Sequence, residues 1–265
     1  MVPRPADGFT WAPAGWGLAL RAGALAHVVH GWTAKPLRLR GDVEGERREW
    51  AQVADAAGVG PASLVRLQQV HEASVHVAAS THSPIRSAPR SPVFPRADIA
   101  VSDRPGIAVA VQVADCVPLL IAAPHGPVAA AHAGWRGTAA NVAGRAVEAL
   151  VEGGSDVSQL HAAIGPSIGA CCYEVGAEVN ESFGQAGWPA GLRQRWFSTR
   201  GRSLRLDLWE ANRDQLIASG VPAANVHVSG LCTSCHAEWF HSYRRDGAGT
   251  GRMAAFIKPP PENTL

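Results

Sequence analysis

The order of apolar and polar positions predicts three neighbouring strands in the middle of the chain. Residues 107–113 are apolar except for Gln112, are rich in valine and lack a helical period, which is typical of a buried strand. Residues 119–123 and 128–131 predict two more strands around a turn. The first strand leads into Asp115 and Cys116, and the third ends at His132, so we expect these side chains to lie close together.

Helices are predicted where a capping residue comes before a mixed apolar stretch. Thr138 is a suitable N-cap for a helix that runs to about residue 151, before a pair of glycines. The same reasoning predicts helices over residues 46–57, 176–183 and 208–218, the last capped by Asp207.

The remaining segments complete a chain in which strands and helices do not alternate strictly. Residues 184–202 are expected to be irregular, and residues 1–20 to be irregular or at a sheet edge. Further strands are predicted for residues 26–32, 64–67, 160–164, 226–231 and 253–257. Such a mixed order favours an α+β fold, with a mixed β-sheet layered with helices in a single domain over residues 1–265.

Residues 80–96 contain four prolines among serines and arginines. Proline cannot donate to a helix or a sheet ladder, so this segment is predicted to be a loop. A surface insertion is the favoured interpretation, and a lid over a site is the alternative.

Composition narrows the classes of function. The chain has 24 basic and 22 acidic residues and a net charge of +2, with no basic stripe that would indicate a nucleic-acid partner. Its longest apolar stretch, residues 107–123, is interrupted by Gln112, Asp115 and Pro118, which does not suit a membrane span. The five cysteines are an odd number and do not resemble a secreted disulfide framework. Together with an N-terminus unlike a signal peptide, this predicts a cytoplasmic protein.

Three residues form a candidate metal site. A catalytic zinc ion usually has three protein ligands and one open position, and His71, Cys116 and His132 could supply such a set. Their separations match no short zinc motif, so three unrelated residues remain the alternative from spacing alone. Asp115 and Arg136 lie beside two of them in the sequence, and a polar cluster of this kind is costly to bury without a function.

A set of motifs in consistent order resembles the laccase-domain family, whose members are named polyphenol oxidases, peptidoglycan-editing factors or purine nucleoside phosphorylases. The resemblance spans about residues 71–257. It rests on QVH (69–71), AD (97–98), VADCVP (113–118), HAGWRGT (132–138), IGPSIG (164–169), CYEVG (172–176), CT (232–233), SYRRDG (242–247) and TGR (250–252).

The resemblance implies a zinc site at His71, Cys116 and His132. It also implies phosphorolysis of adenosine, inosine, guanosine and methylthioadenosine, with adenosine deamination as a second activity in which Asp115 could move protons. The partners would then be a purine nucleoside and phosphate. Guanidinium groups suit phosphate oxygens, and the candidates to bind phosphate or ribose are Arg136, Arg244, Arg245 and Arg252. Pairing of these arginines with local acids such as Asp246 is the alternative.

The resemblance weakens near the N-terminus. HGWT (30–33) is similar to the family's opening strand, but AKPL (34–37) stands where an Arg-x-Gly-Gly segment is expected. That arginine is a candidate substrate contact in relatives. Lys35, Arg38 and Arg40 are the candidate replacements, although lysine offers a point charge rather than a bidentate fork.

Other functions remain open. Cys116 could be the nucleophile of a metal-free cysteine hydrolase acting on an amide or a cell-wall peptide precursor, with His132 or His71 as its base. A copper ion could occupy the same ligands in a polyphenol oxidase, whereas a true multicopper site needs many paired histidines and the eleven here are mostly scattered. A binding protein that retains the fold without activity is a third alternative.

The sequence CTSCH (232–236) matches a c-type haem attachment signature. Haem attachment of this kind requires export, so the absence of a signal peptide argues against it. A structural zinc ion at Cys232, Cys235 and His236 is a weaker hypothesis than two buried thiols.

Overall fold

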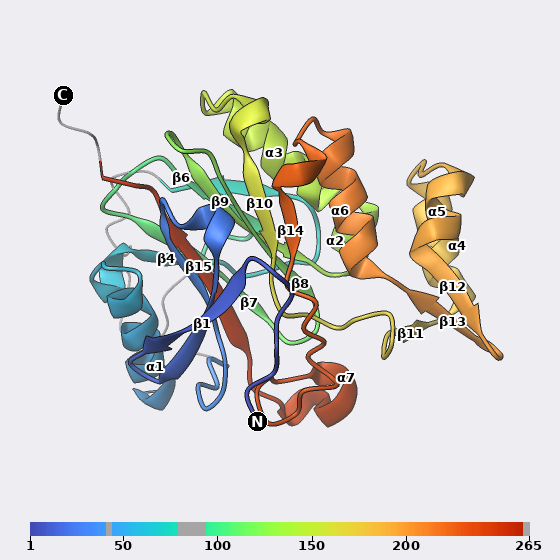
Figure 1. Ribbon diagram of the computed structural model, residues 1–265, viewed down its shortest axis with the longest axis horizontal. Helices are drawn as coiled ribbons and strands as arrows, with labels where there is room; N and C mark the ends of the chain where they lie inside the picture. The colour runs from blue at the N-terminus through green and yellow to red at the C-terminus, as the bar shows by residue number, and fades with distance from the viewer. Residues whose placement is uncertain (41–43, 79–93, 262–265) are drawn as a thin grey trace.

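The computed structural model describes residues 1–40, 44–78 and 94–261, with side chains of the first helix described from residue 47. Two six-stranded sheets dominate it (Figure 1). In spatial order, the first sheet consists of β1 (Phe9–Ala14), β2 (Gly17–Ala22), β3 (Val29–Thr33), β15 (Met253–Lys258), β7 (Ala108–Val113) and β4 (Leu64–Arg66). The second consists of β14 (Val226–Val228), β10 (His161–Ile164), β8 (Val117–Ala122), β9 (Val128–Ala133), β6 (Ile99–Ser102) and β5 (Val75–Val77).

The two sheets pack face to face around an apolar core. On β7, Val109, Val111 and Val113 join a buried cluster that also contains Leu120 of β8 and Ala130 of β9. Successive side chains of a strand point to opposite faces, so the alternate residues of β7 face away from the second sheet. Strands buried on both faces explain the nearly continuous apolar runs in the sequence.

Helices cover the outer faces of the sheets. Helix α1 (Glu44–Ala56) packs Trp50 and Val53 against the outer face of the first sheet. Helices α2 (Trp135–Ala139), α3 (Val142–Glu152) and α6 (Leu208–Ala218) lie against the second sheet, where they share its outer core. Figure 1 shows α1 on one side of the sheets and α3 and α6 on the other. Within the described residues, none of the helices combines the length and hydropathy needed to cross a bilayer.

A smaller unit extends from one end of this arrangement (Figure 1). It has a three-stranded sheet in the order β11 (Glu174–Val175), β13 (Ser203–Leu206) and β12 (Phe197–Arg200). Two helices, α4 (Ala177–Gln185) and α5 (Ala190–Trp196), pack beside this small sheet. The short helix α7 (Tyr243–Asp246) is not part of this unit and comes shortly before β15 in the chain.

The α+β class with helices layered on mixed sheets is confirmed, as are the central strands and three of the four predicted helices. Asp207 caps α6 as expected, because its carboxylate accepts hydrogen bonds from the backbone N–H groups of Trp209 and Glu210. The predicted single sheet is in fact two large sheets and one small sheet. Local periodicity cannot distinguish one sheet from two, because it gives no information on which strands pair.

Two local predictions were wrong. The helix predicted from residue 138 to 151 is two helices, because Asn141 adopts a left-handed φ of 61° and caps α3 through the N–H of Gly144. Residues 184–202 contain α5 and β12, contrary to the prediction of an irregular segment. Residues 1–20 contain β1, which lies at the edge of the first sheet in agreement with one of the two predicted alternatives, and most of its hairpin partner β2. These elements are short, so their periodicity is too brief to detect. Most of the predicted loop at residues 80–96 lies outside the described residues.

Candidate active site

The candidate site lies where the chain crosses from one large sheet to the other. His71 follows β4 of the first sheet and comes before β5 of the second. Cys116 lies in the short connection from β7 of the first sheet to β8 of the second. His132 belongs to β9, where it pairs with Pro118 of β8. The two crossings and β9 therefore bring these three side chains to one edge of the sandwich.

The three predicted ligands form one cluster. One ligand atom from each of His71, Cys116 and His132 lies within 4.8 Å of the other two. The two imidazole rings are nearly perpendicular, with their centroids 4.8 Å apart and an interplanar angle of 88°. His132 is buried, Cys116 is partly buried and His71 is exposed, so the cluster opens to solvent on the side of His71.

Asp98 holds both histidines in position. Its carboxylate accepts a hydrogen bond from Nδ1 of His132 at 2.8 Å, which leaves Nε2 of that ring for the cluster. The same carboxylate accepts from the backbone N–H of His71 at 3.0 Å and of Glu72 at 2.7 Å. A carboxylate that fixes the orientation of a histidine is the usual support behind a metal ligand.

The cluster carries an unusual distribution of charge. Burial alone would raise the pKa of the Cys116 thiol, but the charge of His132 and hydrogen bonds with both histidines outweigh burial and lower this pKa to about 6. Burial alone would lower the pKa of His132, but the Cys116 thiolate and the hydrogen bond to Asp98 raise it to about 9. In the protein without a metal ion, Cys116 and His132 therefore form a thiolate–imidazolium pair at neutral pH.

Backbone conformation at the cluster is strained. His71 has a φ of 63° and Asp115 has a φ of 90°. Residues other than glycine rarely adopt a positive φ. Gly134 lies directly against the thiol, because a Cβ atom there would be 2.9 Å from Sγ of Cys116 and 3.6 Å from Cδ2 of His71. The chain thus leaves room at the cluster that any larger residue at position 134 would fill.

The donor set fits a metal ion. One thiolate and two imidazoles suit zinc and also copper, and three protein ligands leave a coordination position open for a substrate or water. The hydrogen bonds of Asp98 supply the second layer of support that such sites require.

A cavity of about 1010 Å³ opens beside the cluster. It is lined by all three ligand residues and by Asp115, and a purine nucleoside is small enough to enter a cavity of this size. The lining also includes polar, aromatic and basic side chains, among them Gln68, Gln69, Trp135, Arg136, Tyr173, Tyr243, Arg244 and Arg252.

Arg136, Arg244 and Arg252, three of the four arginines that line the cavity, give it a positive wall. Arg136 stacks on Trp135, with its guanidinium carbon 4.3 Å from the ring centroid. Arg244 lies over Tyr173 at 5.0 Å and donates to the carbonyl of Glu174 at 2.6 Å. The guanidinium of Arg252 donates to the carbonyls of Thr250 and Gly251. In the described part of the chain, none of the three forms an ion pair with a carboxylate, so their charges remain available to an anionic ligand.

Asp115 lines the same cavity, and its carboxylate organises two neighbouring segments. One oxygen accepts from Oγ1 of Thr233 at 2.6 Å, and the other accepts from Oγ of Ser242 at 3.0 Å and from the backbone N–H of Arg244 at 2.6 Å. Three donors leave part of the acceptor capacity of a carboxylate unused, so Asp115 can also contact a ligand.

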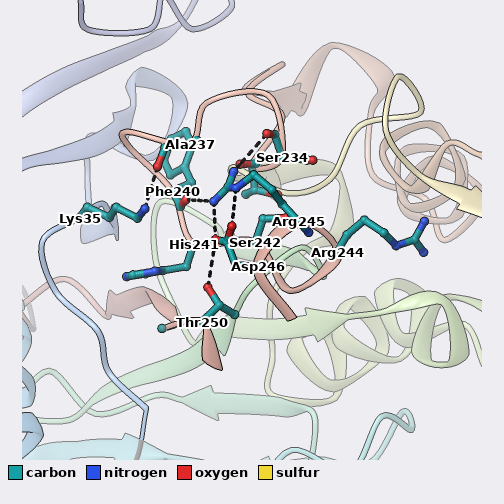
Figure 2. A network of polar contacts seen from close by, with 12 residues as sticks. Lys35, Ser234, Ala237, Phe240, His241, Ser242, Arg244, Arg245, Asp246 and Thr250 are labelled. Carbon is teal, nitrogen blue, oxygen red and sulfur yellow. Dashed lines mark hydrogen bonds and ion pairs between the residues drawn. The ribbon is translucent and has the colours of Figure 1, made fainter. Parts of the chain in front are cut away.

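Arg245 lies outside the cavity lining. Its guanidinium donates to the carbonyls of Thr233, Ser234 and Phe240 and pairs with Asp246. Figure 2 shows this network around Arg245, with the side chain of Arg244 pointing away from it. This geometry favours the alternative that the sequence left open, in which Arg245 pairs with a local acid.

The candidate N-terminal replacements also lie apart from the cavity lining. Lys35 donates to the carbonyl of Ala237 at 2.7 Å, a contact drawn in Figure 2. Arg38 and Arg40 both donate to the carbonyl of Gly249 at 3.2 Å. These three cations pack the N-terminal segment against the C-terminal one.

Sequence reasoning missed the support provided by Asp98 and the contribution of Tyr173 and Tyr243 to the cavity. Asp98 belongs to one of the recognised motifs, and its position just before β6 could have indicated a site residue. The two tyrosines come from segments that are distant in the sequence, and no local pattern places them together.

Comparisons with known proteins identify relatives of this chain. A family model described as multi-copper polyphenol oxidoreductase laccase matches residues 40–259. Purine nucleoside phosphorylase YlmD of Geobacillus stearothermophilus is 40% identical over 193 residues, which are 72% of this chain and 70% of the relative. Adenosine deaminase RL5 from an unknown prokaryotic organism is 37% identical over 196 residues, 74% of each protein. The crystal structure of the hypothetical protein YfiH of Bacillus licheniformis has a TM-score of 0.83 at 30% identity, and covers 96% of this chain and 99% of its own. This chain therefore belongs to the multi-copper polyphenol oxidoreductase laccase family.

Proposed function

We propose that this protein is a zinc-dependent purine nucleoside phosphorylase that accepts adenosine, inosine, guanosine and methylthioadenosine and also deaminates adenosine. One observation carries the proposal: a candidate metal-ligand set lines the same cavity as three arginines that form no ion pair with a carboxylate among the described residues. The relatives named purine nucleoside phosphorylase and adenosine deaminase support the same chemistry.

In phosphorolysis, a phosphate oxygen forms a bond to the anomeric carbon of the sugar while the bond from that carbon to the purine nitrogen breaks. Arg136, Arg244 and Arg252 would hold the phosphate anion, since guanidinium groups can bind its oxygens in pairs. Holding phosphate and nucleoside together removes most of the entropic cost of their encounter. Trp135 and Tyr173 already stack against two of these arginines, which limits the directions in which the guanidinium groups can point.

The other residues of the site keep the reacting groups in place. A zinc ion held by His71, Cys116 and His132 would supply a Lewis acid at this edge of the cavity. Asp98 fixes the ring of His132 and the backbone of His71. Asp115 holds the backbone of Arg244, and in deamination its remaining acceptor capacity would let it move a proton at the purine amino group.

The test combines metal analysis with product analysis. Purified protein is assayed for bound zinc and copper, and for release of free base from the four nucleosides with and without phosphate. The proposal predicts stoichiometric zinc, base release that depends on phosphate, and loss of both zinc at this site and activity in Cys116→Ala. Ser198→Ala, at an exposed position of β12, is the control and should behave as the parent. Base release at the parental rate by folded Cys116→Ala would overturn the proposal.

A metal-free cysteine hydrolase is the second candidate, and the low pKa of Cys116 favours it. A thiolate beside an imidazolium is a competent nucleophile for an amide. The two candidates differ in the effect of metal removal. Chelation should abolish phosphorolysis, whereas a cysteine hydrolase should keep or gain activity when its thiol is freed.

A copper-dependent polyphenol oxidase is the third candidate, and the family description favours it. In the described residues, the two groups able to hold a metal contain only two histidines, both in the candidate active site. Multicopper oxidases need several histidine-rich sites, so any copper chemistry here would use one ion. Oxygen consumption with a phenolic substrate, measured on copper-loaded and zinc-loaded protein, separates this candidate from the first.

A further inference from the structure

A second cluster of four cysteines lies apart from the candidate active site. Cys171 and Cys172 occupy the turn before β11, and Cys232 and Cys235 occupy the loop after β14. All four sulfur atoms lie within 4.8 Å of one another. The sequence shows only a CxxC pair and a separate CC pair, so their meeting is a product of the fold.

The backbone holds the two cysteine-bearing segments side by side. Ser167 forms a parallel bridge with Cys232. The N–H of Ser167 donates to the carbonyl of Leu231, and the N–H of Thr233 donates to the carbonyl of Ser167. The four sulfur atoms are thus brought together by an ordered pairing of main chains.

Two of the distances between the sulfur atoms are close to those around a single tetrahedral ion, and all lie within 4.8 Å. Zinc–sulfur bonds of about 2.3 Å place tetrahedral thiolates about 3.8 Å from one another. Sγ of Cys235 lies 3.4 Å from Sγ of Cys172 and 3.6 Å from Sγ of Cys171. An iron–sulfur cluster would hold its cysteines farther apart, because several iron atoms would lie between them.

The surroundings suit a site with excess negative charge. Four thiolates around a divalent ion carry a net charge of −2. The N–H of Gly169 donates to Sγ of Cys232 at 3.3 Å, a contact that stabilises a thiolate. Arg205 donates to the carbonyls of Ala170 and Cys171, and Arg245 donates to the carbonyls of Thr233 and Ser234. Two cations therefore flank the cysteine loops.

We propose that Cys171, Cys172, Cys232 and Cys235 bind a structural zinc ion. A closed set of four cysteines is the usual form of such sites. This assignment replaces the weaker hypothesis from the sequence, in which His236 completed the set, and it removes the interpretation of Cys232 and Cys235 as two buried thiols, because Cys235 is exposed.

A zinc ion at this position would brace the wall of the large cavity. Cys172 comes directly before Tyr173, which lines the cavity. Cys232 comes directly before Thr233, which donates to the carboxylate of Asp115. The ion would tie together the two segments that carry these residues, without itself touching the substrate.

The experiment isolates the four-cysteine cluster by replacing Cys116, the cysteine of the candidate active site. The chain has five cysteines, so Cys116→Ser leaves only the proposed four. We expect this variant to retain one zinc ion per chain. After replacement of zinc by cobalt(II), it should show the intense thiolate-to-cobalt charge-transfer absorption that several sulfur ligands produce. Adding Cys171→Ser and Cys235→Ser should remove both the zinc and this absorption.

The cobalt spectrum of Cys116→Ser keeps the test decisive even if the triple variant fails to fold. Absence of zinc and of charge-transfer absorption in folded Cys116→Ser would overturn the proposal. So would iron with labile sulfide, or two disulfides in protein purified under reducing conditions. The result does not depend on the proposed enzymatic activity. Cys116→Ser already lacks the thiolate of the candidate active site, and the measurement is metal content and absorption rather than turnover.

Discussion

Nδ1 of His132 lies 2.8 Å from a carboxylate oxygen of Asp98, and both side chains are almost fully buried. The same carboxylate accepts hydrogen bonds from the backbone N–H groups on either side of the exposed candidate ligand His71. We predict that Asp98→Asn weakens zinc binding at the candidate active site by about 10–100-fold. The amide removes the negative charge that orients His132 and presents a donor to N–H groups that need an acceptor. Competition with a chromogenic chelator measures this change.

Asp103→Asn is the matched control for Asp98→Asn. Asp103 is exposed and pairs with its neighbour Arg104, so its variant should bind zinc as the parent does. Asp98→Asn should also lower the free energy of unfolding by about 1–3 kcal/mol, because a buried acceptor of several hydrogen bonds is lost. Parental zinc affinity in Asp98→Asn would contradict the supporting role that we assign to Asp98.

The arginines of the cavity wall are predicted to bind phosphate. Arg136→Ala and Arg244→Ala should each lower kcat/KM for phosphate by about 10–100-fold, which corresponds to the loss of one charge-assisted contact. Stability should change little in Arg136→Ala and should fall by about 1 kcal/mol in Arg244→Ala, which loses the hydrogen bond to the carbonyl of Glu174. Steady-state kinetics at varied phosphate concentration checks this prediction. Arg145→Ala, on the exposed face of α3, is the control, and an equal loss there would remove the argument for a phosphate site.

Arg245 is predicted to show the opposite behaviour. Its guanidinium joins three backbone carbonyls and Asp246, so Arg245→Met should lower the free energy of unfolding by about 1.5–3 kcal/mol. The KM for phosphate should remain within about twofold of the parent, since the side chain does not line the cavity. Urea denaturation and the same kinetic assay measure the two effects. A large rise in the KM for phosphate with unchanged stability would instead restore Arg245 as a ligand contact.

Much of the fold could be predicted because buried strands leave a local signature. The run at residues 107–113 indicated β7, and Asp207 marked the start of α6 correctly. The break at Asn141 could not be predicted, since it depends on a left-handed residue inside a stretch with strong helical pattern. Assignment of strands to two sheets is equally hidden, because pairing between distant strands, such as β15 with β7, leaves no local trace. The prediction of one domain stays a prediction.

The residues of the candidate site could be predicted where a sequence motif contains them. They could not be predicted where the fold alone determines which side chains reach the cavity. The family resemblance is confirmed by the match over residues 40–259. It named His71, Cys116 and His132, which the structure places together. It could not separate Arg244 from Arg245, because adjacent residues of a short helix point in different directions and only the fold shows which one meets the cavity. The four-cysteine cluster escaped for a similar reason, since its halves are about 60 residues apart and neither half alone is a complete ligand set.

The reactivity of Cys116 is predicted to extend to unusually low pH when the metal is removed. The pKa of its thiol is lowered from 9.0 to about 6, so the reactive thiolate forms at lower pH than in an ordinary cysteine. At pH 7 about nine-tenths of Cys116 should be thiolate. The rate of carboxamidomethylation in chelator-treated protein should therefore rise with a midpoint near pH 6 and reach a plateau well below pH 9. Peptide mass spectrometry distinguishes Cys116 from the other four cysteines.

His132→Gln tests the cause of that shift. Burial raises the pKa of Cys116 and the imidazolium of His132 lowers it, so removing the imidazolium should move the midpoint upward by more than one pH unit. His125→Gln changes an exposed histidine in the turn between β8 and β9 and should leave the midpoint unchanged. A parental midpoint in folded His132→Gln would show that another group lowers the pKa of Cys116. Because the same thiolate is the ligand of the proposed zinc ion, zinc should bind to the parent down to lower pH than to a variant whose thiol titrates normally.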